Sequence, residues 1–322
     1  MFVLGIQGSP RKNGNTGVLL SAFMMEAERL GAEVCTVNVD QMNITPCREC
    51  GFCDNKGICS INDDMMKIYP LLRRSDLIVV ATPIFFYSVT AQLKALVDRA
   101  QILWSRKYVL NLDDPGQEWR SGFLLALGAT KGDNLFDGVS LTSKYFFDAV
   151  GADFKGSLTF RQIEKSGDIE KHPTALSAVK ECANDLIKPL LNRKRVLFVG
   201  RENACESQMA SAFTRFYAGD IFDVMSGGSE PADSLNAIML KVMSEKGIDM
   251  AFRKPKSLED ALKYFNPDLV YTMGCGDVCS FPPDVMIEDW ILPEHGGSPV
   301  VFMRQIRDDI ERLVFKLIEE TS

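Results

Sequence analysis

The 322-residue chain lacks an excess of basic residues and lacks any long apolar segment. Its 36 lysines and arginines are outnumbered by 43 acidic residues, and the net charge of −7 argues against a nucleic-acid-binding surface. No apolar stretch approaches the ~18 residues of a membrane span, and no signal peptide precedes the strand-like run at Phe2. These absences predict a cytoplasmic protein that binds neither membrane nor nucleic acid.

Four of the nine cysteines fall between positions 47 and 59. Thiols this close together serve a metal, an iron–sulfur cluster or a disulfide relay rather than packing. Cysteines stay reduced in the cytoplasm, which favours a metal or redox role over a structural disulfide. Structural zinc and thiols without any metal remain alternatives, although zinc sites usually use two well-separated pairs. The four candidate ligands are Cys47, Cys50, Cys53 and Cys59.

Apolar strand-like runs alternate with amphipathic helical stretches in two successive parts of the chain. This alternation predicts two α/β domains with doubly wound parallel sheets, at 1–190 and 194–322, on either side of a short basic junction. The strands predicted in the first domain are 2–7, 33–38, 77–81, 122–128 and 154–160, and the helices are 16–30, 64–74, 89–104, 138–150 and 174–190. The strands predicted in the second domain are 196–199, 223–226, 268–273 and 285–291, and the helices are 207–217, 234–246 and 299–319.

The loop that leaves the first predicted strand has the composition of a phosphate-binding loop. It matches neither the dinucleotide pattern Gly-x-Gly-x-x-Gly nor a Walker sequence. Its glycines let backbone amides approach an anion, and the N-terminus of the following helix adds partial positive charge. A solvated turn that only caps this helix is the alternative. The candidate phosphate-binding residues are Ser9, Arg11, Asn13, Asn15 and Thr16.

Two further loops follow the third and fourth predicted strands. In α/β proteins ligands bind at this carboxyl edge of the sheet, which favours a binding role although aromatic runs are more often core. The first loop offers aromatic faces and backbone amides, and the second is a common kind of glycine-rich turn. The candidate residues are Pro83, Ile84, Phe85, Phe86, Tyr87 and Ser88 in the first loop, and Ala129 and Thr130 in the second.

The three loops resemble those of the NAD(P)H-dependent FMN reductases of the flavodoxin-like superfamily. The cysteine motif, followed by an acidic helix start at 62–65, resembles that of iron–sulfur flavoproteins, a branch of the same superfamily. The resemblance implies a flavodoxin-like domain that binds FMN through its loops and a [4Fe–4S] cluster through the four cysteines. It also implies an oxidoreductase that forms a homodimer or higher homo-oligomer. NAD(P)H or a protein such as ferredoxin would exchange electrons with it, and NAD(P)H would have to stack directly on the flavin.

The second predicted domain resembles the low-molecular-weight tyrosine phosphatases and, more closely, the arsenate reductases built on that fold. The resemblance runs from 196–210 to 288–290, but Gly200 stands at the position of the nucleophilic cysteine and Glu206 at that of the oxyanion-binding arginine. Phosphatase or arsenate reductase chemistry by the usual route is therefore not expected. Cys205, Cys275 and Cys279 remain as buried apolar thiols, redox thiols or an arsenical site. The alternative function is a redox sensor whose second domain binds a partner, anion or arsenical without turnover.

Overall fold

The computed structural model describes residues 1–11, 13–274, 281, 285–292 and 298–321, and it divides into two compact units. Unit 1 comprises residues 1–111 and 117–191, and unit 2 comprises 112–116 and 192–322. The short segment 112–116 belongs to unit 2 because Asp113 pairs there with the backbone of Gly247 and Asp249, at N–O distances of 2.6 and 2.8 Å. In the part of the chain that the structure describes, no helix is both long and apolar enough to span a membrane.

Unit 1 is built on a parallel five-stranded sheet in the order β2-β1-β3-β4-β5. The strands are β1 (Phe2–Gln7), β2 (Glu33–Asn38), β3 (Leu77–Pro83), β4 (Ser121–Leu127) and β5 (Asp153–Phe160). The three central strands are almost wholly buried, as expected for apolar runs covered on both faces. The chain reverses its direction of strand addition between β1 and β3, and doubly wound folds bind ligands at this point.

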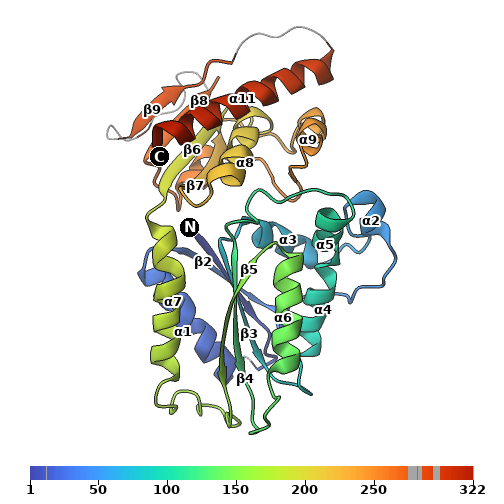
Figure 1. The fold of residues 1–322 in the computed structure, drawn as a ribbon, viewed down its shortest axis with the longest axis vertical. Helices are drawn as coiled ribbons and strands as arrows, with labels where there is room; N and C mark the ends of the chain where they lie inside the picture. Colours follow the sequence, from blue (N-terminus) through green and yellow to red (C-terminus); the bar gives the residue numbers. More distant parts are fainter. Residues whose placement is uncertain (12, 275–280, 282–284, 293–297, 322) are drawn as a thin grey trace. The chain divides into compact units, whose positions relative to one another are not determined.

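Helices cover both faces of this sheet (Figure 1). One face carries α1 (Asn15–Arg29) and α7 (Ala175–Leu191), and the other carries α3 (Met65–Arg74), α4 (Ala91–Arg99), α5 (Gln101–Tyr108) and α6 (Asp137–Ala149). Apolar residues of α1 and α7, such as Phe23 and Val179, pack against Val3 and Val79 of the sheet. Between β2 and α3 lie the 3-10 turn η1 (Val39–Gln41) and the short helix α2 (Phe52–Lys56), neither of which the sequence pattern predicted.

The single helix predicted over 89–104 is wrong, because α4 and α5 are separate helices that meet at Ala100. The backbone N–H of Ala100 is shared between the carbonyl oxygens of Leu96 and Val97, at 3.2 and 3.0 Å, which tightens the last turn of α4. The N–H of Leu103 then donates to Ala100 O at 2.8 Å and starts α5. Neither glycine nor proline marks the break, so the pattern held no signal for it.

Unit 2 has a parallel four-stranded sheet in the order β7-β6-β8-β9. The strands are β6 (Lys194–Gly200), β7 (Phe222–Gly228), β8 (Leu269–Met273) and β9 (Met286–Asp289). One apolar core joins the sheet to α8 (Glu206–Ala218), α9 (Ala237–Ser244) and α11 (Pro299–Thr321), and a smaller one joins it to α10 (Leu258–Leu262). The two parallel-sheet α/β units confirm the predicted fold class.

Candidate functional site

The predicted phosphate loop starts on β1 and is fixed at once to its neighbour β3. The N–H of Gly8 donates to Ala81 O at 2.7 Å, and the Thr90 hydroxyl donates to Gly8 O at 2.6 Å. A Cβ at Gly8 would lie 2.6 Å from the Leu93 side chain and 3.0 Å from Ala81 O, so a larger residue would have to displace Leu93. Gly8 thereby holds the loop against the first turn of α4. Thr90 is also the N-cap residue of this helix.

The polar residues of this loop divide into those with and those without protein partners. Asn15 is buried and uses its whole amide: Nδ2 donates to Lys165 O at 2.8 Å, and Oδ1 accepts from the N–H groups of Gly167 and Ile169. Its side chain thus anchors the segment after β5. Ser9 is buried and accepts from the N–H of Arg11 at 3.2 Å, whereas Arg11 and Asn13 are exposed at the loop's surface. Thr16 is buried in the first turn of α1.

The loop after β3 is a tight turn with two aromatic residues in an unfavourable backbone conformation. Phe86 and Tyr87 have φ values of 48° and 63°, while Phe85 and Ser88 exchange two backbone hydrogen bonds of 3.0 Å across them. Bulky residues in the left-handed region store about 1–2 kcal/mol each. The Phe86 side chain is fully exposed, at 102%, so no packing within unit 1 compensates for this strain. Strained, exposed aromatic residues at a sheet's carboxyl edge are typical of a ligand site.

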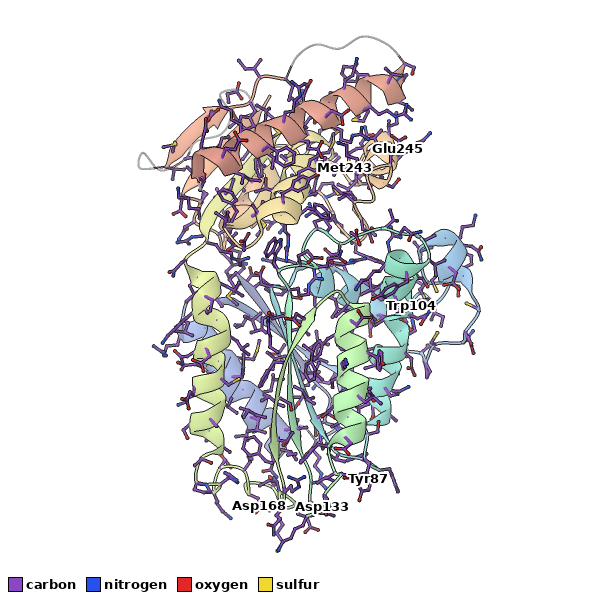
Figure 2. The ribbon with its side chains drawn as sticks, in the orientation of Figure 1. Tyr87, Trp104, Asp133, Asp168, Met243 and Glu245 are labelled. Atoms are coloured by element: carbon purple, nitrogen blue, oxygen red, sulfur yellow. The ribbon has the colours of Figure 1, made fainter. Side chains whose placement is uncertain are left out.

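The turn after β3 contacts the segment that follows β4. A Cβ at Gly138 would lie 2.3 Å from the carbonyl oxygen of Tyr87, so glycine is required for this close approach. Ala129 and Thr130 are exposed just after β4. Figure 2 shows Tyr87, Asp133 and Asp168 at one end of unit 1. The structure therefore brings the three predicted loops to the same edge of the sheet.

The four clustered cysteines share one cavity. Its volume is about 890 Å³, and Cys47, Cys50, Cys53 and Cys59 all contribute to its wall. Aromatic residues of two helices line it as well: Trp104 of α5, and Tyr145 and Phe146 of α6. Cys47 and Cys50 are exposed, and Cys53 and Cys59 are half-buried, all as free thiols. The cavity therefore brings four soft sulfur donors together inside unit 1.

The buried side chain of Arg99, at the end of α4, fixes both ends of the cysteine segment. Its guanidinium donates to the carbonyl oxygens of Thr45 and Ile61, at 2.8 and 3.2 Å, and to both carboxylate oxygens of Asp63, at 2.7 and 3.1 Å. The Tyr69 hydroxyl donates to the carbonyl oxygen of Arg99 at 3.0 Å. Residues before Cys47 and residues after Cys59 are thus held by one charged group. No pattern in the sequence singled out this arginine.

The charge pair beneath the cysteine segment is tight because both partners are buried. Burial acts to raise the pKa of Asp63, but hydrogen bonds from Arg99 and from the N–H groups of Thr45 and Met65 outweigh it and hold that pKa below its usual value. Burial acts to lower the pKa of Arg99, and the Asp63 carboxylate raises it above its usual value. Both groups therefore stay charged at neutral pH.

The thiols themselves meet contrasting surroundings. The Ser60 hydroxyl and the N–H of Phe52 lower the pKa of Cys50, whereas burial and then the nearby Asp54 carboxylate raise the pKa of Cys53 despite a hydrogen bond from Ser105 at 3.4 Å. Four cysteine thiols are the donor set that iron–sulfur clusters use, so the residues present fit such a group. In the described part of the chain no three His, Cys, Asp or Glu side chains already converge as metal ligands. The cavity collects the donors, and ligation would draw them together.

In unit 2, the loop from Gly200 to the start of α8 is held by a network around Asn203. This residue is buried at φ 49°, and its amide donates to Ser207 Oγ and accepts from Gln208 Nε2, both at 2.9 Å. Its Oδ1 also accepts from the N–H of Lys256 at 3.0 Å. These bonds join the loop to the start of α8 and to the segment before α10.

Comparison with known proteins identifies the family of this unit. Residues 195–321 match the model of the low molecular weight phosphotyrosine protein phosphatases. Arsenate reductase 2 of Staphylococcus haemolyticus is 31% identical over 128 residues, which are 38% of this chain and 95% of that protein. Unit 2 belongs to the low molecular weight phosphotyrosine protein phosphatase family, and it is similar to this arsenate reductase. The thioredoxin-dependent arsenate reductase of Corynebacterium glutamicum is a similar solved structure, with 30% identity, a TM-score of 0.36, and coverage of 47% of this chain and 76% of its own.

Residues 1–134 match the family model of NADPH-dependent FMN reductases. An iron-sulfur flavoprotein of Methanosarcina thermophila is 39% identical over 110 residues, which are 34% of this chain and 58% of that protein. The chain thus spans little more than half the length of that relative. The sequence predicted two resemblances, and both are confirmed. The first is to FMN reductases and iron–sulfur flavoproteins, and the second is to phosphatases and arsenate reductases.

The loop from Gly200 to the start of α8, all of which the structure describes, carries no reactive thiol. Cys205 is half-buried with its sulfur 3.4 Å from Met303 Sδ, and burial followed by the Glu206 charge raises the pKa of Cys205 well above its usual value. The predicted redox thiols Cys275 and Cys279 lie outside the described residues. A protonated, half-buried Cys205 beside a carboxylate is poorly suited to nucleophilic attack.

Proposed function

We propose that this chain is an FMN-dependent oxidoreductase that transfers electrons between a reductant, FMN and a [4Fe–4S] cluster held by Cys47, Cys50, Cys53 and Cys59. The observation that carries the proposal is the meeting of loops 8–16, 83–88 and 129–130 at the carboxyl edge of β1, β3 and β4. This edge is where doubly wound sheets bind phosphate-bearing cofactors. The match to FMN reductases over the same residues supports FMN as that cofactor.

The chain's own residues would divide the binding of the cofactor between them. Backbone amides of the first loop and the N-terminus of α1 would bind the phosphate, with Arg11 at the exposed side of the loop. Phe86 and Tyr87 present exposed aromatic surface for a flat ring. When bound, FMN and a cluster would together supply the conversion of a two-electron hydride into single-electron steps.

The exchange partners are proposed as NAD(P)H or a reduced protein such as ferredoxin, acting on a homodimer or higher homo-oligomer. Figure 2 places Tyr87 at one end of unit 1 and Trp104, which lines the cysteine cavity, away from that end. A flavin at the loop edge and a cluster in the cavity would thus be separated within one chain. The oligomer belongs to the proposal because the resemblance to flavin reductases implies it.

Anaerobic turnover tests the enzymatic part of the proposal. The FMN-loaded protein is supplied with NADPH, or with reduced ferredoxin, and an artificial electron acceptor, and oxidation of the donor is followed. Sustained multiple turnover supports the oxidoreductase. A bound flavin that is reduced once and then turns over only sluggishly with either donor contradicts it.

For unit 2 we propose binding of a partner, anion or arsenical without turnover. The loop from Gly200 to the start of α8 is held in place, but the residues that phosphatase or arsenate reductase chemistry needs are absent from it. The Asn203 network holds the loop, yet Gly200 carries no attacking atom and Glu206 places a negative charge at the helix N-terminus. Release of phosphate from p-nitrophenyl phosphate, or reduction of arsenate by the full chain, would contradict this assignment.

A further inference from the structure

Gln7, the last residue of β1, carries a buried polar atom without a partner. Its side chain is only 5% exposed, and no described residue donates a hydrogen bond to its carbonyl oxygen Oε1. Buried polar atoms are almost always bonded, and one left unsatisfied destabilises a fold by about 1–3 kcal/mol. The equally buried Asn15 shows the normal situation, because both ends of its amide are used. An orphan at such a position calls for a missing donor.

The position of Gln7 indicates where that donor would come from. Side chains alternate along a strand, so Gln7 shares its face with Val3 and Gly5. That face is covered by α1, because a Cβ at Gly5 would lie 3.0 Å from Met24 Sδ and 3.2 Å from Leu20. Gln7 is two residues closer to the carboxyl edge. Its side chain therefore projects on the α1 side of the sheet, at the end of β1 that leads into the loop proposed to bind the cofactor.

We propose that Gln7 is an additional FMN-binding residue, whose Oε1 accepts a hydrogen bond from a hydroxyl of the ribityl chain. The inference rests on the proposed FMN site. A phosphate dianion carries only acceptor oxygens and cannot satisfy a carbonyl oxygen, whereas a hydroxyl both donates and accepts. The ribityl chain joins the phosphate to the ring, so its hydroxyls pass the carboxyl end of β1 when the phosphate sits on the adjoining loop. Gln7 is thus unsatisfied without the cofactor and paired with it.

The test replaces the amide by an apolar group of similar size, Gln7→Met. In the FMN-free full chain this change removes an unsatisfied polar atom, so the thermal midpoint should rise. Binding of FMN and of riboflavin, followed by flavin fluorescence, should weaken about five- to tenfold and to the same extent, because both carry the ribityl chain. The matched control is Gln208→Met in unit 2. Gln208 is also buried, at 3%, but its amide donates to Asn203 and Lys254, so this change should lower the midpoint and leave flavin binding unchanged.

Three results would overturn the inference. These are a Gln7→Met protein that is less stable than the wild type without FMN, one that binds both flavins as the wild type does, and one that loses affinity for FMN alone. Failure of the wild type to bind FMN would instead contradict the proposed function, so the two failures are distinguishable.

Discussion

Phe86 and Tyr87 occupy a backbone conformation that their side chains disfavour, and Phe86 is fully exposed. Glycine at either position would remove the strain. That aromatic side chains stand there instead indicates a use outside the stability of the fold. Single residues thus already fall into two groups. Some hold the structure, as the amide of Asn15 does, and others, such as the exposed ring of Phe86, are available for a ligand.

Replacing Phe86 by glycine should stabilise the FMN-free protein and weaken its flavin binding. Relief of left-handed strain exceeds the greater chain entropy of glycine, so the free energy of unfolding should rise by about 0.5–1 kcal/mol. Loss of the ring should lower FMN affinity severalfold. Urea unfolding and flavin titration measure both effects. Phe86→Ala is the control: it keeps the strain, so stability should stay near that of the wild type while affinity falls. Lower stability of Phe86→Gly would contradict this account.

Glu206→Arg should raise the affinity of unit 2 for oxyanions above that of the wild type. The change removes a negative charge and adds a guanidinium at the N-terminus of α8, beside a loop whose framework is intact. Phosphate or arsenate at ten times its Kd would stabilise the variant by about 1.4 kcal/mol, visible as a raised thermal midpoint. Glu259→Arg, an equal charge change on α10, should show no such shift. An equal response of wild type and Glu206→Arg to arsenate would contradict the predicted effect of the Glu206 charge.

At the scale of the element, the cysteine segment depends on one helix end. Arg99→Met should remove four hydrogen bonds at once and leave Asp63 buried without its partner. Breaking such a buried pair destabilises by about 3–5 kcal/mol, so the thermal midpoint should fall and iron should be lost from the anaerobically purified protein. Lys94→Met on the same helix breaks only an exposed pair with Asp98 and should change stability by less than about 1 kcal/mol. Wild-type iron content in Arg99→Met would contradict the clamp.

The same pair makes the cysteine segment sensitive to acid. Because the pKa of Asp63 is lower in the folded chain than its ordinary value, Asp63 contributes stability above that ordinary value, and this contribution is lost as the pH falls through the folded pKa. Wild-type stability should therefore decline on acidification in part through this group. Asp63→Asn should be less stable at neutral pH, with a shallower decline below about pH 4, as measured by urea unfolding at pH 7, 4, 3 and 2. Parallel pH profiles would contradict this role.

The sequence predicted most elements because the strands of both units are unbroken apolar runs and their helices are amphipathic. It also predicted the three loops and the cysteine set, since glycines, aromatic residues and thiols are visible by type and spacing. The features that the sequence did not predict depend on tertiary contacts. The break at Ala100 depends on a shared N–H, and a single arginine such as Arg99 has no distinctive pattern. Asn15 was expected to face phosphate, but distant backbone atoms engage its side chain.

At the scale of the whole molecule, one chain carries the folds of two families, and the two units differ in which of their family's functional residues they keep. Unit 1 keeps the loops and thiols that an iron–sulfur flavoprotein would need. Unit 2 keeps its family's fold, and the resemblance drawn from the sequence puts Gly200 and Glu206 at the positions of the nucleophile and of the oxyanion-binding arginine. The chemistry proposed here therefore belongs to unit 1, and unit 2 is proposed as a binding module.

The most direct test of this account is the ratio of iron and acid-labile sulfide to FMN in anaerobically purified full chain. The account predicts about four irons and four sulfides per flavin, with the visible absorption of both groups. Cys50→Ser should lose the iron, while Cys182→Ser, a thiol of α7 outside the cavity, should keep it. Flavin without iron, or one zinc in place of iron, would contradict the cluster and leave a flavin reductase whose four cysteines serve another purpose.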